Sequence, residues 1–205
     1  MKVGEEPDAD IERVRAVREA VGPDVLLRID ANGGYTYPQA LRVMRGLADV
    51  KLEMFEQPLP KEDIDGAVRL RSQSFMAIGA DEGVNSVRDA TMLAQRGAAD
   101  VFTLKLVKIG GIYPALQAAA VAKAHGIDCV VASTYDTQVN AAHCLHLACA
   151  LPEGIIPCDL TCYATQAEQA ESCHILKDGM LRAGDLPGCG VLSLKEIGLL
   201  DEVRL

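Results

Sequence analysis

Short apolar segments alternate with longer helical patterns along most of the chain, and this alternation restricts its fold more than any other feature. The apolar segments predict buried strands, and the segments between them carry apolar residues at helical spacing. One strand and one helix recur about every 25 residues, which indicates parallel βα units. The predicted strands are 25–30, 52–56, 77–81, 101–105, 128–132 and 155–160, and the predicted helices are 8–21, 36–47, 62–71, 86–95, 112–124 and 137–150.

Two architectures are built from such units, a doubly wound open sheet and a (β/α)8 barrel. No GxGxxG motif follows the first predicted strand, so the open sheet of a dinucleotide-binding domain lacks its main signature. The alternation stops after Thr161. We therefore interpret residues 1–165 as a partial (β/α) barrel and residues 166–205 as a C-terminal extension that packs on the barrel or on an absent capping domain.

The charge balance excludes some classes of partner. The chain has 20 Lys and Arg residues against 29 Asp and Glu residues, for a net charge of −9, which argues against a phosphate-binding surface. No apolar run approaches the roughly 20 residues that span a bilayer, and the first residues do not resemble a signal peptide. We therefore expect a cytoplasmic protein that binds neither nucleic acid nor membrane.

Acidic residues recur at the ends of successive predicted strands. Asp30, Glu56 and Asp81 end three of them, and Lys105 ends the next. A single acidic residue there is often a helix cap, but three in phase would meet at the mouth of a barrel. Carboxylates placed so closely repel one another unless a cation joins them. Oxygen ligands alone suit Mg²⁺, with Mn²⁺ as an alternative.

The sequence around these residues resembles a known family. The runs RIDANGGY (28–35), FEQP (55–58), GADE (79–82) and LKLVKIGG (104–111) look like the enolase superfamily, as does PGCGV (187–191). The resemblance is greatest to the mandelate racemase/muconate lactonizing enzyme branch. It implies that the fold is the TIM-type (β/α) barrel of the C-terminal domain, and that Asp30, Glu56 and Asp81 bind Mg²⁺.

The resemblance also implies which residues move protons. No His lies in the predicted strand where the racemase type places one, which matches the muconate lactonizing subgroup with its two lysines. Lys105 would be one of them. Met1–Val3 looks like the end of the Lys-x-Lys motif, so Lys2 would be the other. A neutral lysine is needed as base, and burial favours that form.

The implied reaction starts by removing a proton from the carbon next to the carboxylate of a small acid. Cycloisomerisation, racemisation, epimerisation and dehydration all share this step, and the sequence leaves the choice open. We expect a homo-oligomer, as the family implies. Residues matching substrate-binding or supporting positions are Asn32, Lys108, Asp136 and Asp159.

The part of the family's sequence that this chain resembles begins within the barrel domain. We expect the capping domain, the first barrel strand and most of the second to be absent, which would make the chain a truncated fragment, a mis-started gene product or one piece of a split protein. Its isolated activity would then be low or absent. The alternative is a catalytically inactive barrel fragment that binds metal or assembles with a partner. A third hypothesis is an α/β enzyme that binds no metal. It would not explain why three carboxylates recur in phase with the predicted strands.

Overall fold

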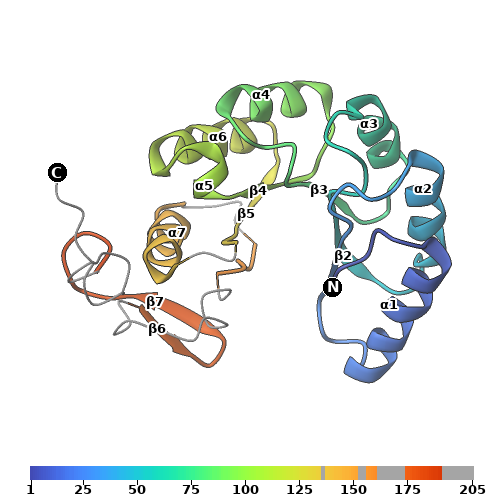
Figure 1. Cartoon of the computed structure of the whole chain (residues 1–205), viewed down its shortest axis with the longest axis horizontal. Coiled ribbons are helices and arrows are strands. Elements are labelled where there is room, and N and C mark those ends of the chain that lie inside the picture. Colours follow the sequence, from blue (N-terminus) through green and yellow to red (C-terminus); the bar gives the residue numbers. More distant parts are fainter. Residues whose placement is uncertain (135–136, 152–155, 161–173, 191–205) are drawn as a thin grey trace, which may run out of the picture.

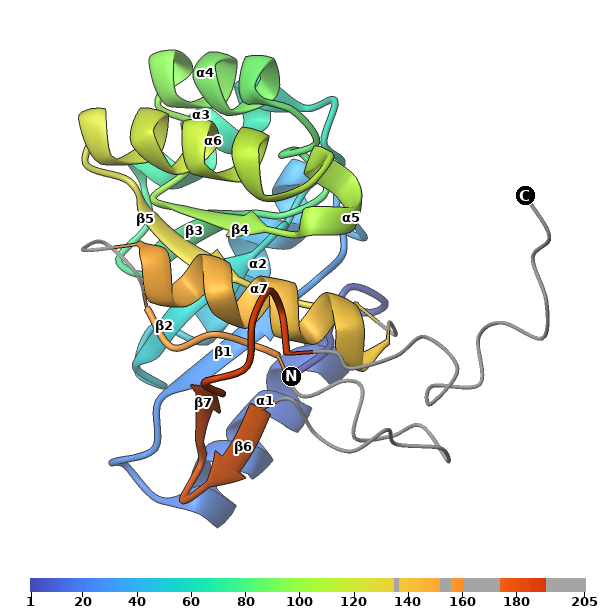
Figure 2. The same ribbon diagram turned by 90° about the vertical axis from the view of Figure 1, so that its left-hand side faces the viewer.

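The computed structural model describes residues 1–134, 137–151, 156–160 and 174–190. A curved parallel sheet runs through the molecule in the order β1-β2-β3-β4-β5, and the helices lie along its outer side (Figures 1 and 2). This is half of a barrel, as the βα pattern predicts. The strands are β1 (Leu27–Asp30), β2 (Leu52–Glu56), β3 (Ala77–Ala80), β4 (Val101–Leu104) and β5 (Asp128–Val131). The helices are α1 (Pro7–Val21), α2 (Tyr37–Gly46), α3 (Ile64–Ser72), α4 (Val87–Arg96), α5 (Leu106–Ile109), α6 (Ile112–Ala124) and α7 (Gln138–Ala150).

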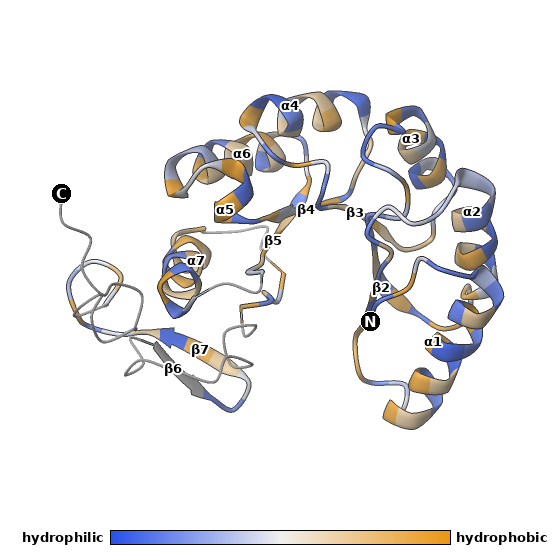
Figure 3. Ribbon diagram, viewed as in Figure 1, coloured by the Kyte–Doolittle hydropathy of each residue, from blue (hydrophilic) through white to orange (hydrophobic). Residues whose placement is uncertain are grey.

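Local sequence explains where the longer helices begin and end. At the start of α4 the Ser86 side chain accepts a hydrogen bond from the Asp89 amide, and Gly97 ends the helix in the left-handed conformation. The buried residues of α2 and its C-terminal turn, Ala40, Val43 and Leu47, recur at helical spacing. Figure 3 shows the resulting alternation of hydrophobic and hydrophilic residues around α2 and α4.

The core lies mainly between the sheet and the helices. One cluster of buried residues joins β3–β5 to α4, α6 and α7, and a second joins β1 and β2 to α1 and α2. A smaller cluster on the inner side of the sheet contains Met54, Val101, Val130 and Ala132. These inner residues fill the half-barrel below the carboxyl ends of the strands. No helix in the described part of the chain has the length and apolar character needed to cross a membrane.

Two further segments extend the sheet. Lys2 forms a parallel bridge with Asp30, and Asp159 forms one with Ala132. The predicted strand 155–160 is therefore wrong as a full strand, although residue 155 lies outside the described residues. Pro157 explains this, because proline has no amide hydrogen and interrupts a ladder of hydrogen bonds. Across the open side of the half-barrel, Arg28 donates to the Pro157 carbonyl oxygen at 2.8 Å and pairs with Glu53 at 2.5 Å.

Other sequence predictions also need correction. The first strand starts at Leu27 rather than Val25, and Leu26 is 67% exposed. The one-turn helix α5 was not predicted, because its four residues carry no periodic pattern. Beyond Thr161, the described residues 174–190 include an antiparallel hairpin of β6 (His174–Lys177) and β7 (Met180–Ala183), which was not predicted either. Whether 166–205 forms one extension remains a prediction.

The loop after β1 approaches the N-terminal segment closely at Gly34. A Cβ atom added there would lie 2.3 Å from the Gly4 carbonyl oxygen, a backbone contact that must shift. We expect Gly34→Ala to lower the free energy of unfolding by about 1–3 kcal/mol. Gly83→Ala is the matched control, because its Cβ would come no closer than 3.4 Å to a neighbour. Urea denaturation measures both, and equal effects would contradict this packing.

Candidate active site

Three carboxylates meet at the carboxyl ends of neighbouring strands. Asp30 ends β1, Glu56 ends β2, and Asp81 directly follows β3. Asp30 pairs in register with Glu56, which pairs in turn with Gly79. One oxygen of each carboxylate lies within 4.8 Å of the other two. The predicted convergence of these residues is therefore present in the fold.

Lysine side chains surround this acidic cluster. Lys105 lies 2.5 Å and Lys108 lies 3.0 Å from different oxygens of Asp81, whose side chain is fully buried. Lys2 approaches Asp30 Oδ2 at 2.5 Å. Two of the three carboxylates thus already form ion pairs, and both predicted proton-transfer lysines lie at the cluster.

Those ion pairs change the protonation expected of the lysines. Burial lowers the pKa of Lys105, as the sequence suggested, but the hydrogen bond to Asp81 and its charge outweigh burial and raise it. The pKa of Lys2 is raised in the same way, with Asp30 opposing desolvation. These pairings favour the charged form of both lysines, since a nearby carboxylate stabilises an ammonium group. The accessibility of the neutral form at the working site stays a prediction.

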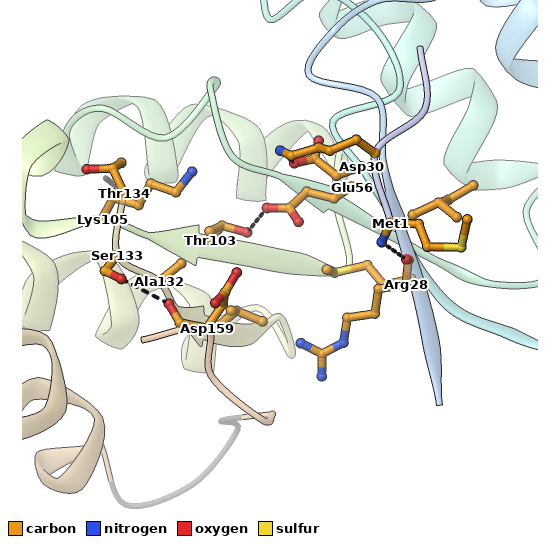
Figure 4. A pocket seen from close by; sticks show the side chains of 14 residues that line it. Met1, Arg28, Asp30, Glu56, Thr103, Lys105, Ala132, Ser133, Thr134 and Asp159 are labelled. Atoms are coloured by element: carbon orange, nitrogen blue, oxygen red, sulfur yellow. Dashed lines mark hydrogen bonds and ion pairs between the residues drawn. The ribbon is translucent and has the colours of Figure 1, made fainter. Parts of the chain in front are cut away.

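Glu56 differs from the two aspartates because no lysine pairs with it in the described structure. Burial first, and then the charges of Asp30 and Asp81, raise the pKa of Glu56 to about 7, against a lowering by the hydrogen bond from Thr103. That bond runs from the Thr103 hydroxyl to Glu56 Oε1 at 2.6 Å (Figure 4). A bound cation would therefore stabilise the ionised form of Glu56 more than that of the two aspartates, which already pair with lysines.

A fourth carboxylate, Glu82, lies at the same end of the sheet. Its Oε1 accepts a hydrogen bond from Asn32 Nδ2 at 2.9 Å, whereas its Oε2 is buried and has no hydrogen-bond partner. Sequence reasoning missed Glu82, although its position next to Asp81 was a usable signal. Hard oxygen donors, an unpaired Glu56 and an orphaned buried oxygen together fit a divalent cation.

Asn32 connects several of these groups. It has a left-handed backbone (φ 45°), and its amide donates to Asp30 Oδ1 at 2.8 Å. Its side chain also contacts Asp30, and it accepts a bond from Lys2 at 2.8 Å. The geometry agrees with the predicted support of the Asp30 site.

Gln57 holds the loops behind the carboxylates and was not singled out from the sequence. Its side-chain oxygen accepts from the Asp81 and Gly83 amides at 3.0 and 3.2 Å, and its Nε2 donates to the Leu59 carbonyl at 2.8 Å. Its own carbonyl accepts from the Gly33 amide at 2.7 Å. One residue therefore ties together the loops that follow β1, β2 and β3.

A cavity of about 370 Å³ on the inner side of the sheet is lined by Asp30, Glu56, Lys2 and Lys105, but not by the fully buried Asp81. In Figure 4, Thr103 and Glu56 lie between Lys105 on one side and Asp30 with Met1 on the other. Asp159 lines the cavity opposite Asp30 and Glu56, and its role near substrate stays a prediction. Asp136, also predicted there, lies outside the described residues.

Comparisons with known proteins agree with this architecture. A family model described as enolase C-terminal domain-like matches residues 1–196. The hydrophobic dipeptide epimerase of Enterococcus faecalis is 39% identical over 151 residues, which are 73% of this chain and 43% of that protein.

Solved structures give the same result. The N-succinyl Arg/Lys racemase from Bacillus cereus has a TM-score of 0.90 at 31% identity, over 96% of this chain and 54% of that one. The muconate cycloisomerase from Pseudomonas fluorescens has a TM-score of 0.87 at 32% identity, over 92% and 53%. The chain thus spans about half the length of these proteins, or less. Fold, motifs and comparisons together establish that it belongs to the enolase C-terminal domain-like family, in the mandelate racemase/muconate lactonizing enzyme branch.

Proposed function

We propose that this chain carries the acid–base and metal-binding machinery of an isomerase that removes a proton from the carbon next to a substrate carboxylate. The observation that carries the proposal is the clustering of Asp30, Glu56 and Asp81, of which the first two line one cavity with Lys2 and Lys105. The relatives support an isomerase, because they are epimerases, racemases and cycloisomerases. They do not favour an inactive barrel fragment.

Asp30, Glu56 and Asp81 would hold Mg²⁺, or Mn²⁺ in its place. When bound, the cation supplies positive charge that binds the substrate carboxylate and stabilises the negative charge developing on its oxygens. Asn32 and Gln57 would hold these ligands in place from the loops. Lys108 would share the charge of Asp81 with Lys105.

Lys105 and Lys2 would act at Nζ as base and acid. A lysine that has lost its proton takes the α-proton, and the ammonium group of the other returns one. When the proton returns to the opposite face of the α-carbon, the configuration of that carbon inverts, which gives epimerisation or racemisation. Loss of a ring carboxylate from the carbon next to the α-carbon opens a lactone, which is cycloisomerisation in reverse, and loss of a hydroxyl group from that carbon, protonated to water by the ammonium group, gives dehydration.

The substrate would be a small carboxylic acid whose remaining part contacts the far side of the cavity. Ser133, Thr134 and Asp159 line that side and offer polar groups to it. We also propose a homo-oligomer, as the family resemblance implies, with Asp136 near substrate.

Deuterium exchange tests this proposal. The full chain with Mg²⁺ in D₂O is expected to exchange the α-hydrogen of an N-succinylamino acid, a dipeptide or a muconate analogue, followed by proton NMR. Lys105→Met is expected to slow exchange by about 10²–10⁴-fold while Mg²⁺ still binds. Lys177→Met, at an exposed lysine of the β6–β7 hairpin, is the control. Unchanged exchange in Lys105→Met, or no exchange by the parent chain, would contradict the proposal.

A further inference from the structure

Thr103 is a buried polar residue on the inner face of β4. Its side chain is 1% exposed, and the buried inward-facing residues around it include Val101 and Val130. A buried hydroxyl costs stability unless it forms a hydrogen bond, so valine would be the ordinary residue at this position. The bond that Thr103 makes is the one to Glu56 Oε1, at 2.6 Å.

That bond crosses a whole strand. Thr103 lies on β4 and Glu56 on β2, with β3 between them, so their backbones are about two strand spacings apart, or roughly 9–10 Å. Gly79 is the β3 residue paired with Glu56. A Cβ atom there would lie 2.9 Å from Met54 Sδ and 3.3 Å from Glu56 Cα. Met54 therefore packs against Gly79, which itself places no side chain between the hydroxyl and the carboxylate.

We propose that Thr103 is a positioning residue for the metal site, whose hydroxyl fixes Glu56 Oε1 and leaves Oε2 directed to the cation. The inference rests on the proposed function, because it requires Glu56 to be a metal ligand. Such outer contacts orient metal-binding carboxylates, and their loss weakens metal affinity. Asp30 and Asp81 are oriented by lysines and Asn32, whereas Glu56 has Thr103 in that role.

Two substitutions separate this role from simple packing. Thr103→Val keeps the shape and removes the hydroxyl, whereas Thr103→Ser keeps the hydroxyl and removes the methyl group. Mg²⁺ affinity is measured by calorimetry on the full chain, and a thermal melt in chelator reports the fold of each variant. We expect Thr103→Val to weaken Mg²⁺ binding by about 10–100-fold and Thr103→Ser to bind as the parent does.

Each other outcome contradicts the inference in a recognisable way. Parent-like Mg²⁺ binding by Thr103→Val overturns the positioning role alone. Equal weakening in Thr103→Val and Thr103→Ser assigns the effect to packing instead. If Thr103→Val does not fold, Thr103→Ala provides a second chain without the hydroxyl and is judged by the same comparison. If the parent chain binds no Mg²⁺, the proposed function fails, and this inference fails with it.

Discussion

Asp10→Ala is expected to lower the free energy of unfolding by about 3–5 kcal/mol, because it breaks a buried network around a charged group. The Asp10 side chain is 1% exposed. Its Oδ2 accepts from the Gly4 and Glu5 amides at 3.0 and 3.1 Å and from the Tyr35 hydroxyl, and its Oδ1 pairs with Arg13. Alanine would leave several of these donors without a partner.

The same network holds the segment that carries Lys2, since Arg13 also donates to the Lys2 carbonyl at 3.1 Å. Burial raises the pKa of Asp10, but the bonds from Tyr35 and the amides, with Arg13, outweigh it and lower the pKa below its ordinary value. A lowered pKa in the folded state stabilises the fold above the pKa of the unfolded chain. This contribution is lost as the pH falls through the folded pKa.

Urea denaturation at pH 7 measures the effect. Asp8→Ala is the control, because Asp8 pairs with Arg42 on the surface, where such a pair contributes about 0–1 kcal/mol. We also expect the stability difference between parent and Asp10→Ala to shrink in acid. Similar losses in the two variants, or a difference independent of pH, would show that the Asp10 network does not stabilise the fold.

Glu56→Gln is expected to abolish Mg²⁺ binding and, in chelator, to make the protein more stable. The parent carboxyl has a pKa raised to about 7, chiefly by burial, so the folded chain binds its proton more tightly than the unfolded chain does. The stability of the parent therefore falls as the pH rises from about 4.5 to about 7. Glutamine cannot ionise, so the variant avoids this loss.

The expected gain is about 1–3 kcal/mol at pH 8, and it should vanish well below pH 4.5, where the parent carboxyl is neutral in both the folded and the unfolded chain. In the parent, protons compete with Mg²⁺ at Glu56, so affinity should decrease as the pH falls below about 7. Melts and calorimetry at several pH values measure both effects. Glu62→Gln, at an exposed glutamate, is the control. If Glu56→Gln is less stable than the parent at pH 8, ionisation of the buried Glu56 carboxyl does not destabilise the parent, and the prediction is wrong.

The sequence predicted the βα architecture well because each parallel strand and its helix carry a local pattern. It predicted the carboxylate cluster for the same reason: Asp30, Glu56 and Asp81 recur in phase with the strands. Pro157 and the short helix α5 were misjudged, since neither has a periodic signal of its own. The roles of Gln57 and Thr103 could not be predicted, because they depend on contacts across strands that only the folded sheet brings together. Glu82 was missed although it stands next to Asp81.

The order of the sheet has a consequence for how the site assembles. Each strand pairs with its neighbour in sequence, so the sheet can grow by adding one βα unit at a time, with short loops to close. Arg28 and Pro157, which are 129 residues apart, make their contact only when the two ends of this series meet. The carboxylates come from three successive units and Thr103 comes from the fourth, so the site requires neither that contact nor the units after β4. Metal affinity would therefore report the assembly of the first four strands, before the series is complete.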